Sequence, residues 1–200
     1  MALINQEAKE LHCKIVYYGP SLGGKTTNIQ WIYDVNRGHD PKNASELREL
    51  DFGTPERTRF YDFLPMDVGE IHGLKVRFHL YSVPGQVVYD ASRRLIMKNL
   101  DGLIFVADSQ LDRMDENIHS LNNLEKNLEL SGYDINKVPL ILQYNKRDLD
   151  NISSVAELRS ALNKFNVPDY EASANNGEGV MTTLETLSRS ILKSLKTGRA

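Results

Sequence analysis

A chain of 200 residues is long enough for one compact domain with a sizeable core and short for two, so we expect a single domain over residues 1–200. Its formal net charge of −3 gives no bulk attraction to nucleic acid or to anionic lipid, and we expect no nucleic-acid partner. The single cysteine, Cys13, excludes an internal disulfide and favours a reducing compartment.

The sequence gives no sign of a targeting or membrane segment. Its first residues lack the basic segment and apolar core of a signal peptide, and no run approaches the roughly 20 apolar residues of a membrane span. Position 2 is not the glycine that myristoylation requires, and no cysteine near the C-terminus is available for prenylation. We therefore expect a cytoplasmic protein without an integral membrane segment.

Strands and helices alternate along the chain, which favours an α/β fold with a mostly parallel sheet and helices on both faces. Apolar runs predict strands at residues 11–18, 74–83, 102–108, 138–144 and 168–172. Helical patterns predict one helix that ends near residue 35 and others at residues 87–99, 114–130, 155–163 and 180–195.

Residues 58–83 read as two strands joined through the region of Gly69 to Gly73. Such a short link makes an antiparallel pair, because parallel neighbours need a crossover of about a dozen residues or more. We expect one antiparallel edge strand, in a sheet of six or more strands. The polar residues 37–56 form a long connection in which residues 45–50 read as a short helix, and loops of this length are usually functional or disordered.

The stretch GPSLGGKTT, residues 19–27, follows a predicted strand and opens a predicted helix, as a phosphate-binding P-loop does. Gly19 and Gly24 would allow the tight backbone and its close approach to a phosphate. Lys25 would contact the β- and γ-phosphates, and the hydroxyl of Thr26 would bind Mg²⁺. The cradle itself is expected to consist of the backbone N–H groups of Ser21, Leu22, Gly23, Gly24 and Lys25, with Thr27 completing the nucleotide-binding set.

Guanine specificity is predicted by the sequence NKRD, residues 145–148, directly after a predicted strand. Asp148 can accept hydrogen bonds from both guanine N1–H and the 2-amino group, whereas adenine offers neither donor. Asn145 would tie this loop to the P-loop, and the aliphatic stem of Lys146 would cover one face of the base. Ser173 and Ala174 follow the next strand, where the Ala174 N–H would reach guanine O6.

With these motifs the chain resembles the Ras-like small GTPases, and in detail the MglA family of bacterial gliding-motility and polarity GTPases. The stretches CKIVYYGP, GGKTT, FYDFLP, GEIHGLKVRFHLY, VPGQVVYDASRRLI, FVADSQ and QYNKRDL match the character of that family in order along nearly the whole chain. The resemblance implies a P-loop NTPase of the Ras-like G-domain type. It also implies a GTP-hydrolysing switch that orders two loops in its GTP-bound form.

The resemblance assigns roles to residues in the two switch loops. Thr58 would sense the γ-phosphate and bind Mg²⁺, with Thr54 as the rival for that role. Arg57 would act as an arginine finger supplied within the chain, Gly85 would donate its N–H to the γ-phosphate, and Gln86 would orient the attacking water.

Two positions depart from the patterns of these proteins. Ser82 stands where most Ras-like GTPases carry an aspartate, which leaves Mg²⁺ without one carboxylate. Ser21 stands where the MglA family commonly has glycine, and there we expect an adjusted rate of hydrolysis and no loss of activity.

The partners implied by the resemblance are a roadblock-domain GTPase-activating protein similar to MglB, an exchange factor, and effectors of the polarity, gliding or type IV pilus machinery. We expect a monomer that hydrolyses GTP slowly unless an activating partner is bound. We also expect its partners to concentrate this protein at a cell pole. Two other functions stay open from the residues alone, a P-loop nucleotide or nucleoside kinase and a GTP-binding scaffold with little turnover.

Overall fold

The computed structural model of the chain describes residues 2–39, 48–50, 58–63, 70–71, 73–83 and 90–197. Within these ranges the strands are β1 (Leu3–Asn5), β2 (Glu10–Tyr18), β3 (Arg48–Leu50), β4 (Thr58–Phe63), β5 (Glu70–Ile71), β6 (Leu74–Ser82), β7 (Gly102–Asp108), β8 (Leu140–Asn145) and β9 (Asp169–Glu171). The helices are α1 (Lys25–His39), α2 (Asp90–Met97), α3 (Met114–Leu130), α4 (Val155–Leu162) and α5 (Val180–Lys196), with a 3-10 turn η2 (Leu111–Arg113) before α3.

The strands form one sheet in the order β3-β4-β6-β2-β7-β8-β9, with β1 paired to β2 and β5 paired to β6. Strands β6, β2, β7, β8 and β9 are parallel, and β4 is antiparallel to β6. The α/β fold is therefore as predicted, and so is the one antiparallel strand, β4, among the six neighbouring strands β4, β6, β2, β7, β8 and β9.

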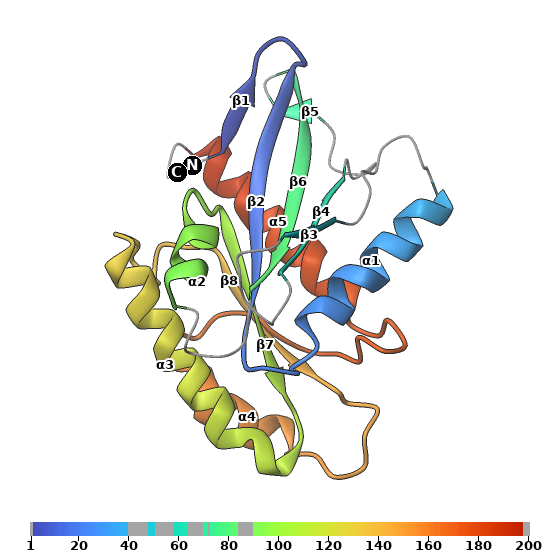
Figure 1. Cartoon of the computed structure of the whole chain (residues 1–200), viewed down its shortest axis with the longest axis vertical. Helices are drawn as coiled ribbons and strands as arrows, with labels where there is room; N and C mark the ends of the chain where they lie inside the picture. Colours follow the sequence, from blue (N-terminus) through green and yellow to red (C-terminus); the bar gives the residue numbers. More distant parts are fainter. Residues whose placement is uncertain are drawn as a thin grey trace.

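Helices cover both faces of the sheet (Figure 1). One apolar core joins α1 and α5 to the sheet through residues such as Ile29, Leu187 and Phe78. The other joins α2, α3 and α4 to the opposite face, with Phe105 and Leu124 fully buried. Each such side chain contributes about 1.5–3 kcal/mol through the area that it removes from water. These two layers fix the strands in register.

Three short strands differ from the sequence-based expectations. β1 pairs antiparallel with β2, an addition that no apolar run predicted. β3 pairs antiparallel with β4, so β4 is not an edge strand. The short helix expected at residues 45–50 is wrong for Arg48–Leu50, because these residues form β3. The link between β4 and β6 also contains β5, which makes a tight hairpin with the start of β6.

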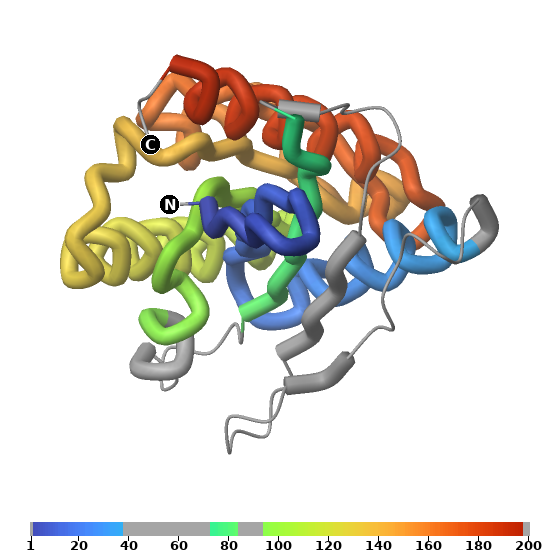
Figure 2. Tube along the Cα trace, turned by 90° about the horizontal axis from the view of Figure 1, so that it is seen from above, coloured from blue at the N-terminus to red at the C-terminus, as the bar shows by residue number. Residues whose placement is uncertain are grey.

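The arrangement places the predicted motifs at one edge of the sheet. Because β6, β2, β7, β8 and β9 are parallel, their carboxyl ends meet along that edge. The chain order reverses at β2, which has β6 on one side and β7 on the other, and such a switch point is where α/β sheets bind ligands. At the opposite edge, β1 lies beside the C-terminal end of α5 (Figures 1 and 2).

Candidate functional site

The P-loop predicted from the sequence lies between the end of β2 and the start of α1. Gly19 has a φ of 141° and Gly24 a φ of 96°, angles that residues with a side chain rarely adopt. A Cβ at Gly19 would lie 2.2 Å from the carbonyl oxygen of Val106, and a Cβ at Gly24 would lie 2.0 Å from Asn145 Nδ2. Glycine is therefore required at both positions, because β7 and the end of β8 approach the loop backbone closely.

Lys25, the first residue of α1, directs its ammonium group back into the loop. The Nζ atom donates to the carbonyl oxygens of Gly19 at 3.1 Å and Pro20 at 2.6 Å. The residue is only 6% exposed, so these carbonyls offset the cost of burying a charge. A fixed cation at a helix N-terminus, where amide groups also point outward, favours a bound anion.

Other residues expected to bind the nucleotide phosphates include Leu22, Gly23 and Thr27, and they differ in conformation and exposure. Leu22 has a φ of 62° and is 82% exposed. A left-handed residue in such a loop turns successive N–H groups into a concave anion-binding surface. The N–H of Gly23 donates within the loop to the Pro20 carbonyl at 3.3 Å. Thr27 is exposed on α1.

The hydroxyl groups of Thr26 and Ser82 converge beside the P-loop. Thr26 Oγ1 donates to Ser82 Oγ at 3.4 Å, and Ser82, at the end of β6, is 1% exposed. Mg²⁺ prefers oxygen ligands, and it commonly keeps several waters when few protein ligands are present. This pair of hydroxyl groups therefore fits the Mg²⁺ that the motif implies. Ser82 occupies the position at which most Ras-like GTPases carry an aspartate.

Asn145, the last residue of β8, connects three loops through its amide side chain. Its Nδ2 donates to the Gly23 carbonyl at 2.8 Å, and its Oδ1 accepts from the Ala174 N–H at 2.9 Å. The expected tie between this loop and the P-loop is thus present in the geometry. The Ala174 N–H, expected to reach guanine O6, is engaged by Asn145 in this structure.

Two further residues of the NKRD loop, Lys146 and Asp148, are hydrogen-bonded to side chains of neighbouring loops. Asp148 Oδ1 accepts a hydrogen bond of 2.6 Å from Ser173 Oγ, which orients the carboxylate. Lys146 has a φ of 67°, and its Nζ donates to Asp108 Oδ2 at 2.6 Å and to Gln110 Oε1 at 2.9 Å. The loop that would read the base is therefore held at both ends by side chains from neighbouring loops.

Comparisons of the sequence with known proteins identify the family. The profile of the family described as "Arf: ADP-ribosylation factor family" matches residues 59–191. The mutual gliding-motility protein MglA of Myxococcus xanthus is 53% identical over 198 residues, which cover 99% of this chain and 100% of that protein. The chain belongs to the MglA family of Ras-like small GTPases.

More distant relatives support the same assignment. ADP-ribosylation factor-like protein 1 of Drosophila melanogaster is 27% identical over 131 residues, covering 62% of this chain and 70% of that protein. Ras-related protein Rab-27B of Rattus norvegicus is 26% identical over 186 residues, covering 92% and 81%. As a member of the MglA family, the chain is a GTP-binding switch that hydrolyses GTP.

The switch residues of this MglA-family chain fall mostly where the structure gives no description. Thr54, Arg57, Gly85 and Gln86 lie outside the described residues. Thr58 is the first residue of β4, where its backbone pairs with Leu50 of β3. Their roles stay predictions.

Sequence reasoning missed a buried polar network behind the P-loop. Gln143 Nε2 donates to Asn28 Oδ1 at 3.0 Å and to Thr183 Oγ1 at 3.3 Å. Asn28 Nδ2 in turn donates to the Gly24 carbonyl at 2.9 Å, and Thr183 Oγ1 donates to the carbonyl of Gly179 at 2.7 Å. Gln143 Oε1 is buried with no hydrogen-bond partner within the described ranges. The network links the P-loop to the start of α5.

Sequence reasoning also missed Asp108, the last residue of β7, and Arg113, the last residue of η2. Asp108 is fully buried and faces Lys146, while Arg113 Nη2 donates to the Ser21 carbonyl at 3.0 Å. An acidic residue at the carboxyl end of a buried strand was a signal for Asp108. Nothing in the local sequence pointed Arg113 toward a loop 92 residues away.

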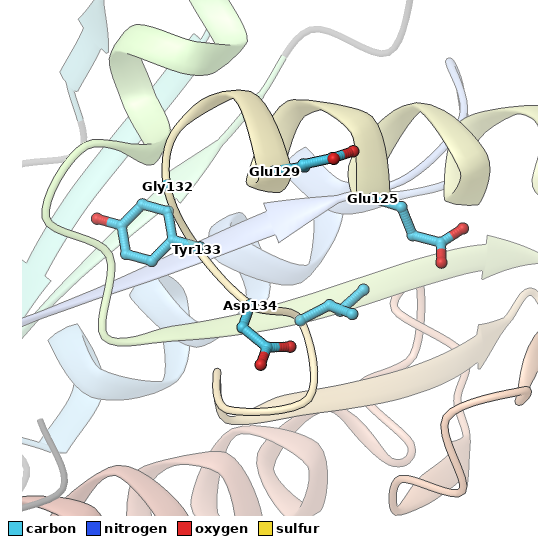
Figure 3. A pocket seen from close by; sticks show the side chains of 6 residues that line it. Glu125, Glu129, Gly132, Tyr133 and Asp134 are labelled. Atoms are coloured by element: carbon cyan, nitrogen blue, oxygen red, sulfur yellow. The ribbon is translucent and has the colours of Figure 1, made fainter.

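A separate hollow lies at the end of α3 (Figure 3), before β8 begins, and thus away from the carboxyl ends of the strands. Its lining includes the carboxylates of Glu125, Glu129 and Asp134. Three acidic groups would repel the phosphates of a nucleotide, so this hollow does not fit one. In the part of the chain that the structure describes, no cluster of three or more His, Cys, Asp or Glu side chains could hold a metal ion, and no helix is long and apolar enough to cross a membrane.

Proposed function

We propose that this chain is a GTP-hydrolysing switch that controls cell polarity and motility, of the gliding or type IV pilus kind, by binding partners according to its nucleotide. The gliding-motility function named for the Myxococcus xanthus relative supports the cellular part of this proposal, because that protein matches the chain over its whole length.

The observation that best supports the nucleotide part is the position of Asn145. Its side chain joins Gly23 of the P-loop to Ala174 of the loop after β9. A ligand with a guanine base at one end and phosphates at the other would span these loops. Asn145 therefore holds the two halves of one elongated binding site at a fixed separation.

We infer the roles of the hydrolytic residues from the motif positions. Lys25 binds the β- and γ-phosphates, Gly85 donates its N–H to the γ-phosphate, and Gln86 orients the attacking water. Arg57 neutralises the charge that develops during phosphoryl transfer.

Thr26 and Thr58 hold Mg²⁺, with Thr54 as the alternative to Thr58. An ion held by these hydroxyl groups would neutralise part of the charge on the β- and γ-phosphates.

The proposed partners are a roadblock-domain GTPase-activating protein, an exchange factor, and effectors of the motility machinery. Because the switch loops change with the nucleotide, the GTP-bound and GDP-bound forms bind different partners. The proposed location is the cytoplasm, with partners concentrating a monomeric GTPase at a cell pole.

The test compares the parent with Gln86→Leu and with a matched control, Gln6→Leu, at an exposed turn residue. We expect Gln86→Leu to hydrolyse GTP at least about tenfold more slowly in single turnover with the activating partner present, because the water loses its orienting group. Gln6→Leu should hydrolyse at the parent rate. GTP-loaded Gln86→Leu should also capture the same proteins from native lysate as the parent loaded with a non-hydrolysable GTP analogue.

Two results would contradict this proposal. Hydrolysis by Gln86→Leu at the parent rate would reject the role of Gln86. Identical captures in the GTP-bound and GDP-bound forms would favour a scaffold with little turnover. A kinase would instead transfer phosphate from GTP to an added nucleoside or nucleotide.

A further inference from the structure

Two basic side chains from different loops meet at one buried carboxylate. Asp108 is 0% exposed, and its Oδ2 lies 2.6 Å from Lys146 Nζ and 3.6 Å from Arg113 Nε. The Asp108 backbone is held in place by Asn117 of α3, which exchanges two hydrogen bonds of 2.8 Å with its N–H and carbonyl groups. A carboxylate buried this deeply is stable only when it is paired and hydrogen-bonded.

Arg113 extends from this carboxylate to the P-loop. Its Nη2 donates to the Ser21 carbonyl at 3.0 Å, and its Nη1 donates to Glu116 Oε1 at 3.0 Å. The Arg113 side chain is 24% exposed and the Glu116 side chain 48% exposed, so the contacts to Asp108 and Ser21 are the more buried ones. The planar guanidinium group can hold an acceptor on each side in a fixed geometry.

The contact with Ser21 determines the direction of a P-loop amide. In a trans peptide the C=O of one residue and the N–H of the next point in opposite directions. With the Ser21 carbonyl held by Arg113, the Leu22 N–H points away from Arg113. The left-handed φ of 62° at Leu22 suits a loop whose N–H groups converge on an anion. Arg113 thus fixes the outer side of a peptide whose inner side is expected to bind phosphate.

We propose that Arg113 is a positioning residue for the β-phosphate and that it acts through the Ser21–Leu22 peptide. Asp108 anchors both Arg113 and Lys146, a residue of the base-reading loop. The inference rests on the proposed guanine-nucleotide site and deepens it. Its consequence is that the lifetime of bound nucleotide depends on a side chain outside the P-loop, the NKRD loop and the two switches.

The first measurement is the rate at which fluorescently labelled GDP dissociates from the full chain. We expect Arg113→Ala to raise this rate about tenfold, because one charge-assisted hydrogen bond to the loop is lost. Arg113→Lys should give an intermediate rate, since one ammonium group can pair with Asp108 or reach Ser21 but cannot bridge both. The matched control is Arg189→Ala, which removes an exposed arginine of α5 that pairs with Glu185 at 3.7 Å and should leave the rate unchanged.

The second measurement tests whether Arg113 acts on the β-phosphate specifically or stabilises the whole nucleotide site. Equilibrium titrations compare GDP with GMP, which lacks the β-phosphate. We expect Arg113→Ala to weaken GDP binding about tenfold and to leave GMP binding unchanged, whereas Asp108→Asn should weaken both, because it releases Lys146 as well. Urea unfolding of the nucleotide-free variants shows whether each remains folded.

The outcomes distinguish this inference from the proposed function. Equal weakening of GDP and GMP by Arg113→Ala, or no weakening of either, would overturn the positioning role while the guanine-nucleotide site stands. Failure of the parent itself to bind GDP would overturn the site and the inference together.

Discussion

Asp148 is the residue on which we predict the choice of base to depend. Its Oδ1 accepts a hydrogen bond from Ser173 Oγ at 2.6 Å, and a carboxylate has further lone pairs on both oxygens with which to accept from a ligand. We expect Asp148→Asn to lower affinity for GTP by at least about a hundredfold, because an amide offers only one acceptor oxygen. The same change should raise affinity for xanthosine triphosphate, whose base carries an oxygen in place of the 2-amino group. Competition titrations with the two nucleotides measure both effects.

A neighbouring carboxylate serves as the control for this change. Asp150 is exposed two residues further along the same loop. Asp150→Asn removes the same charge and should keep the parent preference for GTP. An unchanged preference in Asp148→Asn would contradict the role of Asp148 in base recognition.

For individual residues, the sequence indicated those that belong to a recognisable motif, because the motif implies how its residues are arranged. The glycines of the P-loop and Lys25 are near one another because a strand, a loop and a helix adjoin in the chain. Asn145 lies 122 residues from Gly23, and it was predicted because the NKRD motif itself implies a contact with the P-loop. Asp108 and Arg113 were missed because their contacts depend on how separate loops meet. Lys146 lies 38 residues from Asp108, and Arg113 lies 92 residues from Ser21.

Helix α4 begins with a capping box. Ser154 Oγ accepts from the Glu157 N–H at 3.2 Å, and the Glu157 carboxylate accepts from the Ser154 N–H at 2.8 Å. The Ser154 hydrogen bonds hold the pKa of the Glu157 carboxyl below its usual value. This capping box fixes the residue at which α4 begins, a short distance after the NKRD loop.

Loss of the cap should destabilise the protein without altering the base site directly. We expect Ser154→Ala to lower the free energy of unfolding by about 1 kcal/mol, because a helix N–H loses its acceptor. Ser160→Ala, at an exposed position inside the same helix, should be neutral or slightly stabilising. Urea denaturation in saturating GDP measures both changes, and equal stability of the two variants would contradict the capping role.

Long elements were predicted well and short ones poorly. Helix α3 and strand β7 occur at the predicted residues, because each has a clear periodic or continuous apolar pattern. The pattern at residues 45–50 favours a helix by local propensity, yet Arg48–Leu50 pair with β4. Strand β1 has three exposed residues, so it carries no burial signal and is set by its pairing with β2.

For the whole molecule, Cys13 reports on global opening. It is the chain's only cysteine, lies in the middle of β2 and is 0% exposed, and burial raises the pKa of its thiol to about 12. The thiolate is the form that attacks a thiol reagent, and the native protein both buries the Cys13 sulfur and disfavours its ionisation. We expect native protein to resist thiol labelling at pH 8 and to react fully in urea. Bound GDP should slow labelling further, because a ligand of the native state stabilises it.

The same shift gives a direction for stability at alkaline pH. An unfolded chain ionises Cys13 near the ordinary thiol pKa of 9.0, whereas the folded chain keeps it protonated up to about 12. The stability contributed by the neutral thiol is therefore complete below pH 9 and declines as the pH rises toward 12. Cys13→Ala should flatten this decline in urea titrations, and labelling of native parent protein as fast as unfolded protein would contradict the burial argument.

The position of the two ends of the chain, near β1 and the end of α5, matters for fluorescence imaging. α5 begins beside the nucleotide loops and runs to the far side, where Leu195 packs in the same core as Ala2. A fluorescent domain joined through a flexible linker to either end would emerge on the side away from the nucleotide. Nucleotide exchange and partner capture by such fusions should therefore match those of the untagged chain, which makes either end suitable for a fluorescent tag.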